Sequence, residues 1–282
     1  MPSPDTMNEP TTDQPAKKPG LLASLRPLAL FVVAAWALRS LVVAPFSIPS
    51  GSMLPTMYIG DYLFVHKWPY GYSRYSFPFG IPSFEGRIFG DMPKRGDIVV
   101  FRPPGQEESD FIKRVIGLPG DTIAVTGGRV ILNGQPLDRE AAGFVSIPIS
   151  ANSPCRVVEG ATPMVRPAGE GEGACLYPAY RETLPNGASY LTIDQVDTPR
   201  ADQVAPVTVP AGHLFLMGDN RDDSLDSRYS PYEGGVGLVP LQNLVGRASA
   251  RFWSTDGSAQ WLLPWTWFSA LRAERIGDAT SP

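Results

Sequence analysis

The sequence predicts a mostly β protein behind one N-terminal membrane-spanning helix. Short runs of β-type residues recur between turn signals along the chain, which is typical of a β fold. The 30 Pro and 28 Gly among 282 residues fit numerous turns and would interrupt a helical body. One apolar segment near the N-terminus is long enough to cross a bilayer. A chain of this length can bury a substantial core, so its length does not exclude an enzyme.

The first residues are predicted to form a disordered tail, residues 1–26. Residues 1–20 are rich in Pro, Thr, Asp and Lys and lack an apolar period, so they cannot bury enough surface to order themselves.

The anchor is predicted over residues 27–46, where an apolar run is interrupted only by Arg39 and Ser40. The nineteen residues from Leu28 to Phe46 would span about 28 Å as a helix, close to the roughly 30 Å thickness of the hydrocarbon layer. The alternatives are a buried core helix and a cleavable signal peptide. Length disfavours the signal peptide, and Pro45 and Phe46 stand where its small cleavage-site residues would be expected.

The charges before the span predict its direction. Lys17, Lys18 and Arg26 precede it, and the long domain that follows contributes little to orientation, so the positive-inside rule places the N-terminus in the cytoplasm. We therefore expect a single-pass protein of the bacterial cytoplasmic (inner) membrane with its body on the periplasmic, extracytoplasmic side.

The last part of the chain, residues 256–282, is predicted to be an interfacial segment and tail. The run from Trp261 to Phe268 is apolar and Trp-rich but short, and Pro264 lies inside it. Trp at this density suits a membrane interface, whereas a closing core strand is the alternative.

The body is predicted to contain a catalytic β core, residues 47–136 and 206–255, and an inserted second lobe, residues 137–205. The lobe is weakly hydrophobic and rich in turns. The expected strands are Tyr62–His66, Asp97–Phe101, Phe111–Ile116, Thr122–Val125, Arg129–Leu132, Ala188–Ile193, His213–Met217 and Val245–Phe252.

Charge and cysteine content argue against nucleic-acid binding and against a metal site. The net charge of −4 and pI of about 5.3 come without a basic stripe, so nucleic acid is not an expected partner. Cys155 and Cys175 have no Cys/His cluster around them, so we expect no metal site, and no cofactor is indicated. In an extracytoplasmic body they either form one disulfide or remain two unrelated thiols.

Three stretches carry the candidate chemistry, and the first, residues 47–56, directly follows the span and reads SIPSGSMLPT. A serine beside Gly51 can be held on a strained turn with its hydroxyl exposed and a backbone N–H aimed at a developing oxyanion. An ordinary loop turn is the alternative for this motif alone.

The second stretch, residues 110–121, reads DFIKRVIGLPGD. Alternation along its β-like run puts Lys113 and Val115 on one face and Ile112 and Arg114 on the other. A lysine among apolar neighbours can be desolvated, which lowers its pKa and makes the neutral amine available as a base. A surface strand lysine is the alternative.

The third stretch, residues 217–228, reads MGDNRDDSLDSR. It suits a solvated acidic loop, a cation loop or a network that orients catalytic groups. The offsets of an EF-hand are absent, which argues against calcium. The two histidines, His66 and His213, lie inside apolar strand runs and are expected to be structural, which leaves lysine as the available base.

Taken together, these stretches resemble the bacterial type I signal peptidases, a family of Ser/Lys proteases, in order and in spacing behind an N-terminal anchor. The resemblance covers about residues 40–136 and 206–250. It implies that Ser52 is the nucleophile and Lys113 the general base.

The resemblance also implies supporting roles for neighbouring residues. Ser50 corresponds to a serine that assists the oxyanion hole, and Ser224 to one that orients the lysine. A charged network corresponds to Arg114, Asp219, Asp226 and Arg228. Substrate contacts correspond to Ile48, Pro49, Met53, Asp110 and Ile112.

Two positions depart from the family pattern. Phe111 stands where relatives often have Tyr, and Asp223 where they often have Asn. Neither belongs to the bond-making groups.

The implied fold is a signal-peptidase-like β fold with a smaller inserted lobe. The implied activity is that of a membrane-bound serine endopeptidase that removes signal peptides from exported preproteins and cuts after small residues of the Ala-X-Ala type. Its partners would be the signal peptides of secretory preproteins and the lipid bilayer, with the oligomeric state left open. The alternatives are a self-cleaving repressor, a pilin-processing peptidase and a membrane-tethered scaffold without catalysis.

Overall fold

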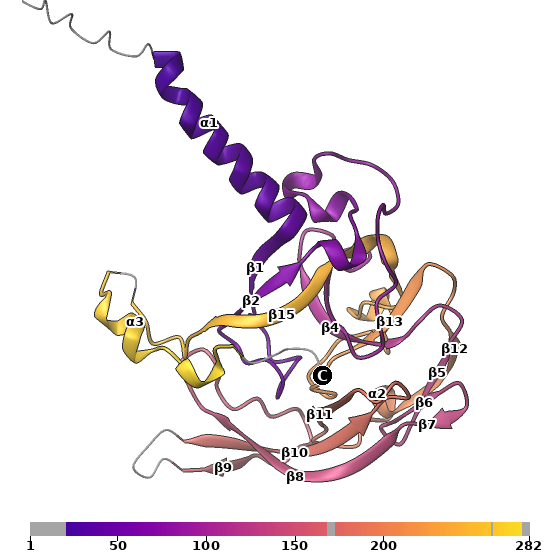
Figure 1. Ribbon diagram of the computed structural model, residues 1–282. Helices are drawn as coiled ribbons and strands as arrows, with labels where there is room; N and C mark the ends of the chain where they lie inside the picture. Colours follow the sequence, from indigo (N-terminus) through magenta and orange to yellow (C-terminus); the bar gives the residue numbers. More distant parts are fainter. Residues whose placement is uncertain (1–20, 168–172, 261, 278–282) are drawn as a thin grey trace, which may run out of the picture. The chain divides into compact units, whose positions relative to one another are not determined.

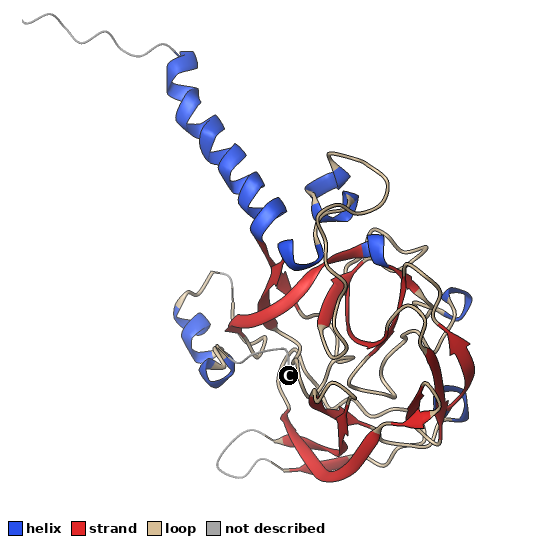
Figure 2. Cartoon of the chain, turned by 45° about the vertical axis from the view of Figure 1, so that its right-hand side comes forward, coloured by secondary structure: helices blue, strands red, loops and turns tan. Residues whose placement is uncertain are grey.

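A computed structural model describes residues 21–167, 173–260 and 262–277, and the chain divides between Ala37 and Leu38 into an N-terminal helix and a body. Strands are the predominant regular element of the body (Figure 1; Figure 2). The predicted mostly β fold is confirmed.

The N-terminal helix α1 covers Leu21–Ala37. Over residues 25–42 the mean hydropathy is 1.6 and only 6% of the segment is buried. Within the described residues it is the one helix long and apolar enough to cross a membrane, judged by length and composition. The predicted tail, residues 1–26, falls largely outside the described residues, and residues 21–26 are helical rather than disordered.

The chain becomes a strand before the predicted end of the anchor, residues 27–46. A π-helical turn at Leu38–Val42 is followed by strand β1, Val43–Ser47. Pro45 gives the physical reason, because its ring blocks a continuing helix while an edge strand tolerates its missing N–H. β1 is such an edge strand, so the last four residues of the predicted anchor belong to the large sheet.

The largest sheet has seven strands, and its neighbouring pairs are antiparallel. In spatial order it contains β1, β2 (Asp61–His66), β15 (Leu244–Ser254), β3 (Ile98–Phe101), β4 (Phe111–Gly117), β13 (His213–Met217) and β14 (Val239–Pro240).

The core lies on both faces of this sheet. All four residues of β3 are buried. Ile98 and Val100 join one apolar cluster, whereas Val99 and Phe101 join another. Alternate side chains of a strand point to opposite faces, so β3 reads as a continuous apolar run because both faces are covered.

Two smaller sheets complete the body. One contains β11 (Ser189–Ile193), β10 (Ala174–Thr183) and β8 (Asp138–Pro148), with β9 (Met164–Arg166) paired to β10. The other contains β12 (Gln203–Thr208), β5 (Thr122–Thr126), β6 (Arg129–Leu132) and β7 (Gln135–Pro136). Short helix α2 (Pro199–Asp202) leads into β12.

The region 137–205 contains long strands that its sequence does not reveal. Most residues of β8 are exposed, so they lack the apolar alternation by which a strand is recognised. β8 nevertheless pairs with β10 along nearly its whole length. A disulfide joins Cys155 to Cys175 at a Cα separation of 5.5 Å and ties the segment after β8 to β10.

The segment after β15 forms a short helix, α3 (Trp265–Ser269), rather than the closing core strand considered as an alternative. Trp265 and Phe268 on this helix are 67% and 78% exposed, and Leu262, which precedes it, is 90% exposed. Pro264 at its N-cap suits a helix start and would interrupt a strand ladder.

A buried carboxylate attaches the C-terminal segment to the large sheet. Asp61, at the start of β2, is fully buried, and Arg275 donates to both of its oxygens at 3.1 and 2.7 Å. Arg251 and Arg272 lie 3.8 and 4.0 Å from the same carboxylate. Ser254 also donates to it, at 2.6 Å. One charge therefore holds cations from β15 and from the chain after α3.

Replacing Asp61 by Asn is expected to lower the free energy of unfolding by about 3 kcal/mol, because it leaves buried guanidinium groups without their carboxylate. Thermal unfolding of the detergent-solubilised protein should show a melting temperature several degrees lower. The control is Glu107→Gln, which breaks an exposed pair with Arg74 and should cost less than about 1 kcal/mol. Equal small shifts in both variants would contradict the role given to Asp61.

Candidate active site

The serine motif forms a tight turn directly after β1. The Leu54 N–H donates to the Gly51 carbonyl at 3.1 Å, and the Met57 N–H to the Met53 carbonyl at 2.9 Å. Met53, Leu54 and Met57 are buried, with exposed fractions of 1% or less. These apolar anchors hold Ser52, itself 7% exposed, against the body.

Met53 packs inside the protein and is not among the residues that line the cleft. The sequence interpretation assigned it to substrate binding. Its position suits an anchor of the turn, because a side chain in the core cannot meet a bound peptide.

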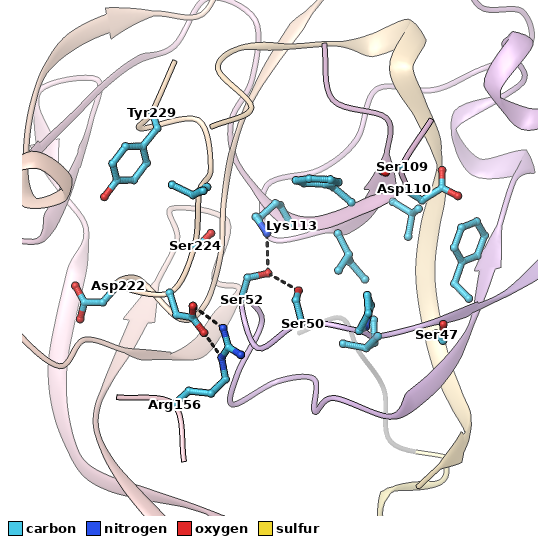
Figure 3. Close-up of a pocket in the computed structure, with 18 residues that line it drawn as sticks. Ser47, Ser50, Ser52, Ser109, Asp110, Lys113, Arg156, Asp222, Ser224 and Tyr229 are labelled. Atoms are coloured by element: carbon cyan, nitrogen blue, oxygen red, sulfur yellow. Dashed lines mark hydrogen bonds and ion pairs between the residues drawn. The ribbon is translucent and has the colours of Figure 1, made fainter. Parts of the chain in front are cut away.

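Lys113 lies in β4 and reaches the serine turn. Its Nζ donates to Ser52 Oγ at 2.7 Å, and the lysine is only 4% exposed (Figure 3). Burial lowers the pKa of Lys113 to about 8, although the nearby carboxylates of Asp226, Asp219 and Asp223 pull it upward. At pH 7 an amine with that pKa is neutral in about one molecule in ten, far more often than an exposed lysine with a pKa of about 10.4.

Ser50 stands beside the reactive hydroxyl. Its Oγ lies 3.5 Å from Ser52 Oγ, with either atom able to donate (Figure 3). In the described part of the chain, no acceptor takes the backbone N–H of Ser52. Two donors are therefore available near the position where an oxyanion would form after attack by Ser52.

The loop after β13 holds the turn in place. The Asn220 backbone N–H donates to the Ser52 carbonyl at 3.1 Å, and its Nδ2 donates to the Gly51 carbonyl at 3.1 Å. A Cβ at Gly218 would come within 2.3 Å of Ser224 Oγ and 2.6 Å of the Ser52 carbonyl oxygen, so only glycine fits there. Asn220 lies in the third sequence stretch, but the sequence did not predict this role for it.

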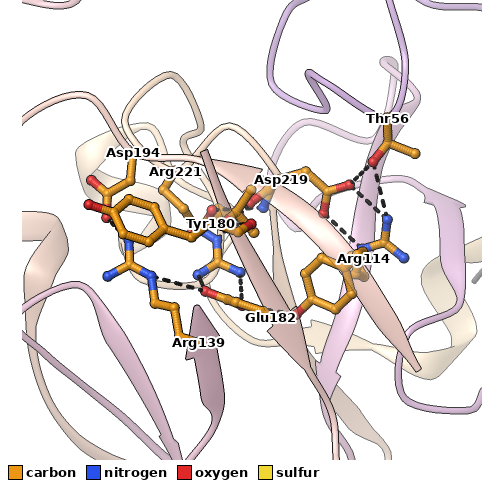
Figure 4. A network of polar contacts seen from close by, with 12 residues as sticks. Thr56, Arg114, Arg139, Tyr180, Glu182, Asp194, Asp219 and Arg221 are labelled. Atoms are coloured by element: carbon orange, nitrogen blue, oxygen red, sulfur yellow. Dashed lines mark hydrogen bonds and ion pairs between the residues drawn. The ribbon is translucent and has the colours of Figure 1, made fainter. Parts of the chain in front are cut away.

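Two buried ion pairs flank the lysine. Arg114 donates to Asp219 through Nε and Nη2 at 2.8 and 2.7 Å, and Asp219 also accepts from Thr56 Oγ1 at 2.5 Å (Figure 4). Arg228 donates to Asp226 at 2.9 Å through both Nε and Nη2. All four charged side chains are almost completely buried.

Ser224 Oγ donates to Asp226 at 2.9 Å. Among the described residues no hydrogen bond joins Ser224 to Lys113, the contact expected from the resemblance. Ser224 does line the same cleft as the lysine.

A third buried ion pair joins the inserted lobe to the loop after β13. Arg221 donates to both oxygens of Glu182, in β10, at 2.6 Å (Figure 4). The Ile193 N–H of β11 donates to the Asp219 carbonyl at 2.9 Å, and the Arg221 N–H donates to the Ile193 carbonyl at 2.8 Å. Sequence reasoning missed Glu182, because nothing in the pattern of β10 indicates its partner in a motif 39 residues away.

The serine and lysine lie in a cleft of about 630 Å³. The sequence-predicted residues that it brings together are Ile48, Pro49, Ser50, Ser52, Asp110, Ile112, Lys113 and Ser224. The ion-paired residues Arg114, Asp219, Asp226 and Arg228 stand behind its wall and are not among its lining.

Comparison with known proteins gives a consistent result. A sequence model of the family described as signal peptidase, peptidase S26, matches residues 21–253. The signal peptidase I of Rickettsia typhi (strain ATCC VR-144 / Wilmington) is 36% identical over 229 residues, covering 78% of this chain and 76% of the relative. That of Rickettsia akari (strain Hartford) is 35% identical over 235 residues, covering 80% and 77%.

The crystal structure of a signal peptidase I from Enterococcus faecalis V583 is 26% identical and covers 56% of this chain and 97% of that one, with a TM-score of 0.29. Because that score is low, the assignment rests on the sequence matches. They extend over most of the chain, and the family model includes all three motif stretches. The family resemblance is therefore confirmed: the chain belongs to the signal peptidase family, peptidase S26, and is a peptide-bond hydrolase.

Proposed function

We propose that the protein is a membrane-anchored endopeptidase that removes N-terminal signal peptides from exported preproteins, with Ser52 as nucleophile and Lys113 as general base. The observation that carries this proposal is the buried 2.7 Å contact between Lys113 Nζ and Ser52 Oγ. The names of the Rickettsia relatives support the same reaction.

The reaction begins with neutral Lys113. Its amine accepts the Ser52 hydroxyl proton while Oγ attacks the carbonyl carbon of the scissile bond. The Ser52 N–H and the Ser50 hydroxyl stabilise the resulting oxyanion. Protonated Lys113 then gives its proton to the leaving amine, and an acyl-enzyme remains on Ser52. Water, deprotonated by Lys113, hydrolyses this ester and restores both residues.

The substrate side before the cut binds as an extended strand. β4 pairs with β3 from Phe111 onward but with β13 only from Arg114 onward, so in the described residues one edge of Phe111 and Ile112 is unpaired. The segment Ser47–Pro49 lines the same cleft as this edge. Backbone pairing along such an edge is independent of sequence. The apolar lining from Ile48 and Ile112 favours small residues such as Ala before the cut.

The anchor and the C-terminal segment attach the enzyme to lipid. The apolar helix and the charges at Lys17, Lys18 and Arg26 support a cytoplasmic N-terminus and a periplasmic body on the inner membrane. Exposed Leu262 and Phe268 near α3 support contact of this segment with the bilayer surface. The preproteins that the enzyme cleaves emerge from the same membrane.

The rival functions lack support from particular residues. A self-cleaving repressor would carry a basic DNA-binding region, which this sequence does not have. A scaffold without catalysis would not need a buried lysine at hydrogen-bond distance from a serine.

Purified protein is expected to shorten a preprotein and to expose the residue that follows an Ala-X-Ala sequence as the new N-terminus. Ser52→Ala should lower kcat/KM at least about 10³-fold, because the nucleophile is lost. Ser146→Ala, an exposed serine of β8, should keep full activity. N-terminal sequencing of the product checks the cut, and a fully active, folded Ser52→Ala protein would contradict the proposal.

Activity is expected to rise with pH through about 8, the pKa to which burial lowers Lys113. The active form is the neutral amine, so kcat/KM should fall as pH drops below that value. Lys113→Arg should be inactive because a guanidinium stays protonated, whereas Lys94→Arg, an exposed lysine, should behave as wild type. A pH-independent kcat/KM, or an active Lys113→Arg protein, would rule out the lysine base.

Protease added to spheroplasts is expected to digest the body and to spare the tail before the span. The reason is the cytoplasmic N-terminus predicted from Lys17, Lys18 and Arg26. Immunoblots against tags at either end would follow the two regions. A protected body with an accessible N-terminal tag would reverse the topology.

A further inference from the structure

The cleft extends from Ser52 in two directions. One side is lined by Ser47, Ser109 and Asp110, and the other by Arg156, Asp222 and Tyr229, with Ser52 and Lys113 between them (Figure 3). We name the second side the leaving-group arm: Arg156, Asp222, Asp223, Leu225 and Tyr229. A peptide that lies along β4 with its reactive carbonyl at Ser52 continues into this arm, so the arm receives the residues after the cut.

Arg156 enters the arm from the inserted lobe, and the lobe fixes it there. Its neighbour Cys155 is joined to Cys175 of β10 by the disulfide. The Arg156 backbone N–H donates to the Tyr177 hydroxyl, also on β10, at 2.7 Å. Its guanidinium donates to both carboxylate oxygens of Asp223, through Nη2 at 2.8 Å and through Nε.

The side chain of Arg156 lies directly on the nucleophile turn. A Cβ at Gly51 would come within 2.7 Å of Arg156 Cδ and 2.8 Å of Nε. Gly51 separates Ser50 from Ser52, so the guanidinium lies beside the reacting groups. Its side chain is nevertheless 36% exposed and lines the cleft.

Within the described residues, the Arg156 guanidinium has N–H donors that no acceptor takes. Of its five N–H donors, Asp223 takes one on Nε and one on Nη2. In the described residues, no acceptor takes the others. Asp223 already neutralises the charge, so these donors suit neutral acceptors better than an acidic side chain. An extended peptide offers backbone carbonyl oxygens whatever its sequence.

We propose that Arg156 binds backbone carbonyls of the first residues after the scissile bond and thereby positions the leaving group, an inference that rests on the proposed function. It assigns a role to the lobe, which supplies this residue. It also accounts for Asp223, the departure from the Asn of relatives, because a carboxylate can hold the guanidinium by two bonds. The recognised chemistry is a peptide backbone, which suits an enzyme that cuts many different mature sequences.

The test compares two substrates with the same signal sequence up to the cut. One continues for several residues as a peptide, and the other ends there as an alkyl ester, so that it has no residue in the leaving-group arm. Arg156→Met keeps an apolar stem over Gly51 and removes the donors. It should lower kcat/KM for the peptide roughly tenfold more than for the ester, the loss typical of hydrogen bonds to a charged group. Arg166→Met, an exposed arginine of the same lobe, should alter neither.

Equal losses on both substrates would overturn the inference and show that Arg156 acts only by holding the serine turn. Unchanged peptide cleavage would overturn it as well. If Arg156→Met does not fold, Arg156→Lys serves in the same comparison, because one ammonium cannot bridge Asp223 and a substrate carbonyl in the same fork. Should wild type cleave neither substrate, or should Ser52→Ala cleave both, the proposed function fails rather than the role of Arg156.

Discussion

A buried contact between an amine and a hydroxyl sets the requirements for the rest of this protein. Lys113 Nζ and Ser52 Oγ lie 2.7 Å apart in a place where the lysine is 4% exposed. Desolvation favours the neutral amine and lowers the pKa of Lys113 to about 8. Nearby carboxylates oppose this, but Asp219 and Asp226 are each held by a buried arginine. Acidic groups therefore lie close to the site as members of ion pairs, and burial remains the largest influence on the pKa of Lys113.

This contact joins parts of the chain that lie far apart in the sequence. The serine turn follows β1, the lysine lies in β4, and the loop after β13 packs on the turn through Asn220. The inserted lobe then holds that loop through the pair between Glu182 and Arg221. The lobe therefore contacts the loop that packs on the nucleophile turn. It also supplies Arg156, which lines the cleft.

Local patterns predicted the regular parts of the fold well. Runs of β-type residues between turn signals identified β2, β3, β4 and β13 with bounds close to the observed ones. β8 was missed because its mostly exposed residues form no such run, and β1 was assigned to the anchor because its apolar residues continue the helical run. Composition cannot separate a strand from a helix in a short apolar segment; Pro45 was the available signal.

Within the site, the sequence alone left both Ser52 and Lys113 with ordinary alternatives, and only the joint family resemblance singled them out. Contacts between residues far apart in the sequence could not be predicted, since no local rule pairs Arg156 with Asp223 or Arg275 with Asp61. The assignment of Met53 to substrate binding overlooked that an apolar residue beside a nucleophile can serve as an anchor in the core.

Burial lowers the pKa of Lys113 so that a neutral amine becomes available beside Ser52, and an NMR titration of that amine measures this pKa directly. The protein would carry ¹³C- and ¹⁵N-labelled lysine in detergent micelles, with Lys113→Arg used to assign the signal. We expect the Lys113 signal to titrate with a pKa of about 8. A signal that titrates at about 10.4, like an exposed lysine, would contradict it.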